Sequence, residues 1–237
     1  MLCDMTFGKG AKDGLPIAMG YISVAFAFGM IAVQKGMPAW SPVLISLTNF
    51  TGTGQFAGAD LIAAGAAFTE IAFTLLIINM RYLLMSLSLS QRLSPEISFW
   101  GRLVIAFGNT DEIFAVAMQQ GRVLNFRYML GLILCSYSGW VLGTALGAFA
   151  SSFLPMSVRS ALGIALYAMF IAIILPAAKS SGPVTRVVII SVIISCIFYY
   201  VPFLSALSKG WVIIICGVVS SAVGAAFFPL REEEAVK

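Results

Sequence analysis

Apolar residues fill eight long stretches of this chain, and short polar segments separate the stretches. A helix needs roughly 20 apolar residues to cross a bilayer, and each stretch has about that length. The stretches cover residues 14–34, 42–66, 69–91, 97–119, 127–150, 158–178, 186–206 and 210–229. This pattern predicts an all-α, polytopic membrane protein with a single transmembrane domain over residues 1–237.

Two of these stretches contain glycine and polar residues near their centres. Residues 49–58 read Asn-Phe-Thr-Gly-Thr-Gly-Gln-Phe-Ala-Gly, and residues 108–112 read Gly-Asn-Thr-Asp-Glu. A continuous helix fits both sequences poorly. Non-helical backbone at membrane depth is tolerated only where protein or a water-filled cavity surrounds it. We therefore predict about six full transmembrane helices plus two broken or re-entrant helical elements, at 42–66 and 97–119.

Charge agrees with a membrane protein and bears on its topology. The chain is 60% hydrophobic and 10% charged, whereas soluble domains carry about 25% charged residues. The net charge is +4, and the basic residues are spread along the loops rather than clustered. This pattern indicates topology signals rather than a nucleic-acid surface. If 42–66 and 97–119 are re-entrant, Arg92 and Arg102 lie in the cytoplasm, as the positive-inside rule favours. Both termini are expected in the cytoplasm in either arrangement.

Arg81 lies inside the apolar stretch 69–91, two residues after Asn79. An arginine at the centre of a bilayer costs about 2.5–3.5 kcal/mol on insertion scales, so such residues usually face a protein interior and mark a substrate or ion pathway. On a regular helix the two side chains point about 200° apart, and they face one ligand only if the helix is irregular. Arg81 either clamps a carboxylate or forms an ion pair that fixes helix packing.

The glycine-rich break is the first candidate for a substrate site. Glycine lets backbone approach a ligand closely, and the start of a half-helix offers partial positive charge to a carboxylate such as that of an amino acid. The alternative is that the glycines allow close helix packing. Together with Asn79 and Arg81, the predicted substrate-binding residues are Asn49, Thr51, Thr53, Gly54 and Gln55.

Carboxylates are the candidates for proton coupling, because the chain contains no histidine. A desolvated carboxylate binds its proton more tightly, and Asp111, Glu112 and Asp60 lie in or near apolar stretches. The alternative for the first two is a helix start, in which Asn109, Thr110 or Asp111 is the N-cap and the acids occupy the first turn.

Other classes of function find little support in the sequence. Neither H-E-x-x-H nor G-x-S-x-G is present, and the missing histidine removes the commonest general base, so an enzyme is not expected. The four cysteines lack metal-ligand spacing, and no P-loop occurs, so no metal or cofactor is expected. A channel is the alternative to a transporter, although no carbonyl filter motif is evident. Glu70 is interpreted as an exposed acid between two segments.

The motifs, in this order and spacing, resemble those of the AzlC family, the large subunit of bacterial branched-chain amino acid exporters. The resemblance runs from about residue 14 to about residue 179. Its motifs are Gly14-Leu15-Pro16, Thr53-Gly54-Gln55-Phe56-Ala57-Gly58, Asn79-Met80-Arg81, Thr110-Asp111-Glu112, the set Trp140, Gly143 and Gly147, and Ala168-Met169-Phe170-Ile171-Ala172. Tyr82 stands where the family often has histidine, which concerns the substrate more than the architecture.

The resemblance implies a function that composition and spacing do not. It implies export of valine, leucine, isoleucine or methionine across the bacterial inner membrane, coupled to the proton gradient. It also implies a small AzlD-type helical partner subunit. On this basis we expect alternating access, and the alternative is a channel or a transporter for another small carboxylate-bearing solute.

Overall fold

The computed structural model describes residues 5–120, 123–150, 181–202 and 207–227, with isolated positions between 155 and 179. In these residues the secondary structure is helical apart from turns and one isolated parallel bridge between Leu93 and Leu124. The prediction of an all-α protein is confirmed. The predicted segment 158–178 lies largely outside the described residues, as do both chain ends.

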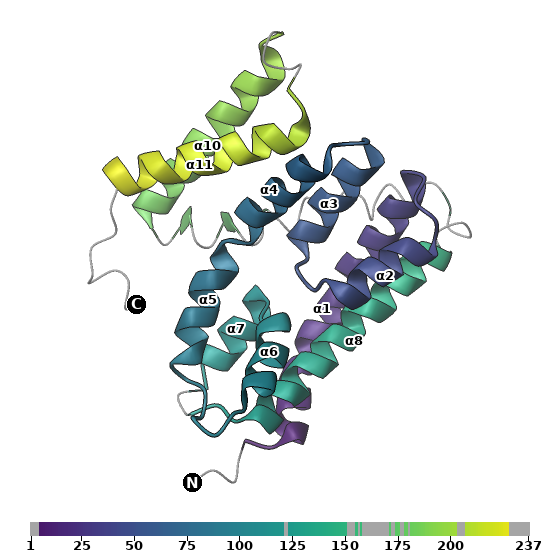
Figure 1. The fold of residues 1–237 in the computed structure, drawn as a ribbon, viewed down its shortest axis with the longest axis vertical. Coiled ribbons are helices and arrows are strands. Elements are labelled where there is room, and N and C mark those ends of the chain that lie inside the picture. Colours follow the sequence, from purple (N-terminus) through teal and green to yellow (C-terminus); the bar gives the residue numbers. More distant parts are fainter. Residues whose placement is uncertain are drawn as a thin grey trace. The chain divides into compact units, whose positions relative to one another are not determined.

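Figure 1 shows the described helices coloured in chain order. Their bounds are α1 Phe7–Gln34, α2 Trp40–Thr48, α3 Thr53–Ala63, α4 Phe68–Asn79, α5 Arg81–Ser90, α6 Phe99–Phe107, α7 Asp111–Met118, α8 Phe126–Ala150, α10 Gly182–Tyr200 and α11 Lys209–Phe227. Among the described residues, four helices are long and apolar enough to cross a membrane: α1, α8, α10 and α11. The number rises to five if α4 and α5 are one broken span. The count of six full spans and two broken elements stays a prediction.

Both predicted helix interruptions are present. The stretch 42–66 is divided into α2 and α3 by residues 49–52, and the stretch 97–119 is divided into α6 and α7 by residues 108–110. A further break at Met80 separates α4 from α5, so the expectation of one helix over 69–91 is wrong. Neither glycine nor proline stands there, and the polar residues Asn79 and Arg81 on either side did not by themselves predict a break.

The chain divides into two compact units, which are described separately. The first unit holds residues 1–60 and 79–165, and the second holds residues 61–78 and 166–237. The first unit contains the predicted functional residues and both predicted helix breaks. The expectation of one transmembrane domain stays a prediction.

Close packing of α1 against α8 forms the core of the first unit (Figure 1). Along α8, Gly139 lies against Ala18 and Gly143 lies against Ile22, so the two helices run in the same direction. A Cβ atom at either glycine would stand 2.5 Å from the facing carbonyl oxygen. Small residues allow such backbone contact between membrane helices, and the α8 glycines are therefore needed for this packing.

The second unit holds a buried carboxylate. Glu70, in the first turn of α4, accepts hydrogen bonds from the Ser208 hydroxyl and from the Gly210 N–H at 3.1 Å. The interpretation of Glu70 as an exposed acid is wrong, because only 7% of the residue is exposed. The first N–H groups of a helix have no partner within it and favour negative charge, and Glu70 provides that partner for α11.

The α1–α8 contact predicts that the same glycine-to-valine substitution lowers stability at one position and not at another. Gly139→Val drives side-chain atoms into the Ala18 backbone, and overpacking of this kind costs about 1–3 kcal/mol. Gly20 on α1 has nothing within 4 Å of an added Cβ, so Gly20→Val is the matched control. Thermal unfolding in detergent should show a lower melting temperature for Gly139→Val than for the control. Equal melting temperatures would contradict the assigned packing.

Candidate functional site

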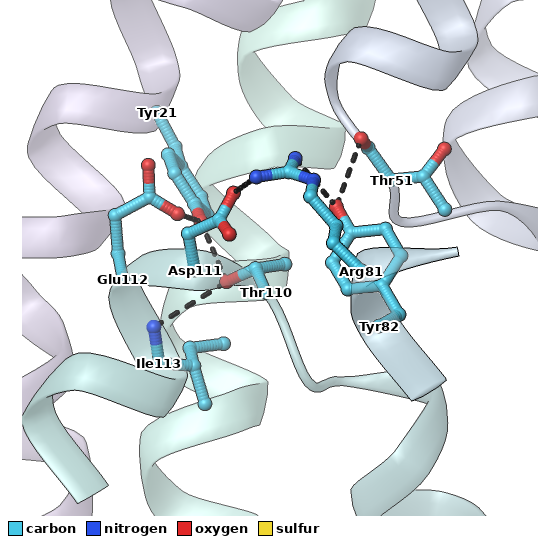
Figure 2. A network of polar contacts seen from close by, with 8 residues as sticks. All are labelled: Tyr21, Thr51, Arg81, Tyr82, Thr110, Asp111, Glu112 and Ile113. Atoms are coloured by element: carbon cyan, nitrogen blue, oxygen red, sulfur yellow. Dashed lines mark hydrogen bonds and ion pairs between the residues drawn. The ribbon is translucent and has the colours of Figure 1, made fainter. Parts of the chain in front are cut away.

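The two predicted helix breaks meet in one polar region of the first unit. Residues 49–52 connect α2 to α3, residues 108–110 connect α6 to α7, and α5 begins between them at Arg81. Tyr21 of α1 reaches the same region (Figure 2). Hydrogen bonds and an ion pair link these elements, and the candidate site is defined by the side chains that make them.

Gln55 bridges the first break. Its side-chain Nε2 donates to the Asn49 carbonyl and, at 3.4 Å, to the Ile45 carbonyl, while its Oε1 accepts from Trp140 Nε1 at 2.9 Å. The residue is only 2% exposed. The break removes helical hydrogen bonds, and the Gln55 amide replaces partners that the backbone loses. Each polar atom of Gln55 is therefore occupied by the protein itself in this conformation.

Asn79 lies against the start of α3. A Cβ atom at Gly54 would be 2.6 Å from Thr51 Oγ1 and 3.1 Å from Asn79 Oδ1, so only glycine lets both side chains come this close. Thr51 Oγ1 donates to Asn49 Oδ1 at 2.7 Å. Asn79 Oδ1 is buried and accepts no hydrogen bond from the described residues. The structure thus brings Asn49, Thr51, Gly54 and Asn79 together, and Thr53 is the first residue of α3.

Arg81 joins the first break to the second. Its guanidinium forms an ion pair with Asp111 and contacts the Tyr82 hydroxyl at 3.4 Å (Figure 2). The Tyr82 hydroxyl in turn donates to the Thr51 carbonyl at 3.1 Å. The side chains of the ion pair remain 40% and 35% exposed. The pair is therefore not sealed inside protein, and a ligand can compete for either charge.

The second break presents two carboxylates at the start of α7. Thr110 is the N-cap, because its Oγ1 accepts from the Ile113 N–H at 3.4 Å. The expected helix start is confirmed, with Asp111 and Glu112 in the first turn. Both acids also make long-range contacts, since Asp111 pairs with Arg81 and Glu112 binds the Tyr21 hydroxyl. The helix start is therefore accompanied by side-chain partners on α5 and α1.

Asp60 lies apart from this network. Its carboxylate pairs with Lys35, the residue that caps the C-terminal end of α1. Both side chains are about as exposed as those of the Arg81–Asp111 pair, at 35% and 41%. No hydrogen bond of the described residues joins Asp60 to either break.

Three aromatic residues of the site were not among the predicted site residues, although Trp140 and Tyr82 were noted in the comparison with the family motifs. Tyr21 and Trp140 are buried, and each packs edge-on against Phe50, with ring centroids 5.7 and 6.1 Å apart. Tyr82 connects Arg81 to Thr51. Buried tyrosine and tryptophan normally have a partner for their polar tip, so a Tyr or Trp well inside an apolar stretch is the signal that could have found them.

Comparison with known proteins finds one family profile and several related membrane proteins. A family profile described as "AzlC protein" matches residues 16–154. The chain is 36% identical over 177 residues to the inner membrane protein YgaZ of Escherichia coli strain K12, covering 72% of each protein. It is 39% identical to an uncharacterized membrane protein of Archaeoglobus fulgidus, covering 73% of this chain and 76% of that one.

A more distant relative has a named activity. The branched-chain amino acid transport protein AzlC of Bacillus subtilis is 25% identical, over 67% of this chain and 63% of its own length. No solved structure matches the chain.

The Gln55–Trp140 hydrogen bond predicts a stability difference between two tryptophan substitutions. Trp140→Phe keeps an aromatic ring but leaves the buried Gln55 Oε1 without its donor, a loss that costs about 1–3 kcal/mol. Trp100 is 75% exposed, and Trp100→Phe is the control. The melting temperature in detergent should fall for Trp140→Phe and stay unchanged for Trp100→Phe. Equal melting temperatures for Trp140→Phe and Trp100→Phe would contradict a stabilising Gln55–Trp140 hydrogen bond.

Proposed function

The chain belongs to the AzlC family, and on this premise we propose that it is a membrane transporter subunit that exports branched-chain or other small apolar amino acids. The proposed mechanism is alternating access driven by the proton gradient. The named activity of the Bacillus subtilis relative supports amino-acid transport. The polar region at the helix breaks supports a binding site within this chain.

Arg81 is the observation that carries the proposal. It lies in an otherwise apolar stretch, at the meeting point of two helix breaks, and its side chain is 40% exposed. Charged residues at membrane depth mark substrate pathways, and discontinuous helices build the substrate sites of many transporters. A guanidinium binds a carboxylate with two parallel hydrogen bonds. The carboxylate of an amino acid is therefore the proposed ligand of Arg81.

The ammonium group of an amino acid needs acceptors, and the site offers them. Asn79 Oδ1 is buried and unpaired among the described residues, and the carboxylates of Asp111 and Glu112 lie at the start of α7. In the proposed site Asn49, Thr51 and Thr53 complete the polar surroundings of the first break, with Gly54 allowing close approach. Gln55 holds the break in shape through Trp140.

Aromatic rings next to the first break favour an apolar substrate side chain. Phe50 packs against Tyr21 and Trp140, and Tyr137 packs against Phe50 with ring centroids 5.4 Å apart. Burial of aliphatic groups contributes about 0.8 kcal/mol per CH₂. We therefore assign these rings to the side-chain half of the site, which suits leucine, isoleucine, valine or methionine.

The remaining parts of the proposal concern the surroundings of the chain. We propose a small AzlD-type partner subunit in the bacterial inner membrane, with both termini of this chain in the cytoplasm. Family membership supports the partner, and the printed name of the Escherichia coli relative supports the location.

The assigned role of Arg81 predicts loss of transport on substitution. Hydrogen bonds to charged groups contribute about 1.5–3 kcal/mol, so Arg81→Ala should reduce efflux about tenfold or more. Arg81→Lys keeps the charge but loses the fork geometry and should recover only part of the rate. Efflux of leucine from preloaded cells measures both, with this chain and its candidate partner expressed together.

Arg92→Ala, at an exposed position outside the site, is the control. Wild-type efflux by Arg81→Ala, at equal membrane levels, would contradict the site.

The carboxylate clamp also predicts substrate selectivity and saturation. Leucine efflux should saturate as the internal concentration rises, and leucinamide, which lacks the carboxylate, should be a poor substrate. Saturation distinguishes a transporter from a channel. Efflux proportional to concentration without a plateau would favour the channel, and equal transport of leucine and leucinamide would remove the clamp from Arg81.

A further inference from the structure

We propose that Glu112, positioned by the Tyr21 hydroxyl, is the carboxylate that binds the coupled proton, while Asp111 stays ionised as the partner of Arg81. The inference rests on the proposed function, proton-coupled export of an amino acid. It selects one residue from the acidic candidates and adds Tyr21 to the transport machinery as a positioning residue.

Asp111 is poorly suited to bind and release a proton. Its carboxylate contacts the guanidinium of Arg81, and an arginine stays protonated in proteins. A positive charge in contact with a carboxylate favours the ionised form. As long as this ion pair stands, a proton on Asp111 would leave the arginine charge without its partner.

Glu112 has different partners. Its carboxylate contacts the Tyr21 hydroxyl, and that hydroxyl lies 2.7 Å from Thr110 Oγ1. Neither of the ion pairs among the described residues includes Glu112. Its surroundings therefore fix no charge on it, and a change in protonation breaks no ion pair.

The Glu112 carboxyl group, the Tyr21 hydroxyl and the Thr110 hydroxyl can stay hydrogen-bonded to one another whether Glu112 is ionised or protonated. When Glu112 is ionised, the Tyr21 hydroxyl donates to the carboxylate. When Glu112 is protonated, its O–H donates to the Tyr21 oxygen, and the Tyr21 hydrogen turns to Thr110 Oγ1. Each hydroxyl oxygen both donates and accepts, so only hydrogens change place. One proton is gained by one carboxylate, and no other bond is made or broken.

The other charged groups near α7 leave Glu112 as the free carboxylate at this end of the helix. On α5, Arg81 faces Asp111, and Tyr82 lies within electrostatic range of both acids. On α1, Lys9 and Asp13 contact Gln120 rather than Glu112, and Gln120 lies beyond the C-terminal end of α7 at Met118, whereas Glu112 is in its first turn. On α8, Tyr128 donates to Asp13 at 2.9 Å.

This position explains how proton and substrate could be exchanged. Ionised Glu112 attracts the ammonium group of an amino acid bound at Arg81, whereas protonated Glu112 does not. The proton and the ammonium group therefore compete for one carboxylate. Such competition is what a carrier needs if it moves the substrate out as the proton moves in.

The experiment compares net transport with exchange in vesicles that contain the full chain and its candidate partner. Glu112→Gln should lose the stimulation of leucine transport by a pH gradient. Its exchange of labelled for unlabelled leucine at equal pH should continue, but with a higher half-saturating leucine concentration, because the neutral amide attracts the ammonium group less. Asp111→Asn should lose both activities, because it disrupts the ion pair at the substrate clamp. Tyr21→Phe keeps the ring contacts with Phe50 and Trp140, and it should shift the pH midpoint of gradient-driven transport while exchange continues.

Two results would overturn the inference without touching the proposed function. One is full stimulation of leucine transport by a pH gradient in Glu112→Gln. The other is an Asp111→Asn variant that loses this stimulation but still exchanges leucine. If the wild type moves none of the tested amino acids, the proposed function fails.

The proton site is then judged without substrate, by infrared difference spectra of purified protein between acid and alkaline pH. The band of a protonated carboxyl should disappear in Glu112→Gln and remain in Asp111→Asn. An unchanged band in Glu112→Gln overturns the inference in that case.

Discussion

The interior of a bilayer offers no hydrogen-bond partner to a peptide group, and side chains supply partners at the two helix breaks 49–52 and 108–110. Gln55 does so across the first break, where its amide binds the Asn49 carbonyl and is itself held by Trp140. Thr110 caps the helix that follows the second break. Tyr82 binds the Thr51 carbonyl from a third element. The polar region at the centre of the first unit is therefore both the means of breaking the helices and the candidate site.

The closely packed α1–α8 pair forms one wall of this region. Glycines on α8 bring the two backbones into contact, and small-residue packing of this kind is a main source of helix association in membranes. The same two helices carry Tyr21 and Trp140, whose polar tips bind Glu112 and Gln55. The α1–α8 pair thus supplies Trp140 to the first break and Tyr21 to the second. The charged residues Arg81 and Asp111 come from α5 and α7.

The different roles proposed for Asp111 and Glu112 follow from the different helices that supply their partners. Asp111 and Glu112 are adjacent in sequence, yet one meets an arginine of α5 and the other a tyrosine of α1. An ion pair with arginine fixes the charge of a carboxylate, whereas a hydroxyl accepts either protonation state. In the proposed mechanism this difference assigns substrate binding to one acid and proton binding to the other.

The sequence alone determined the all-α membrane class and both breaks at 49–52 and 108–110, because glycine and polar residues inside apolar stretches are local signals. It also offered a helix start at Asn109, Thr110 or Asp111, of which the structure selected Thr110 as the N-cap. The tertiary structure alone decided the break at Met80, where no glycine or proline stands, and where Arg81 pairs with Asp111 while Asn79 lies against Gly54. It decided equally that Tyr21 serves Glu112, that Trp140 serves Gln55 and that Glu70 is buried. These partners lie 85 to 140 residues apart in the chain, and spacing along a sequence carries no record of such contacts.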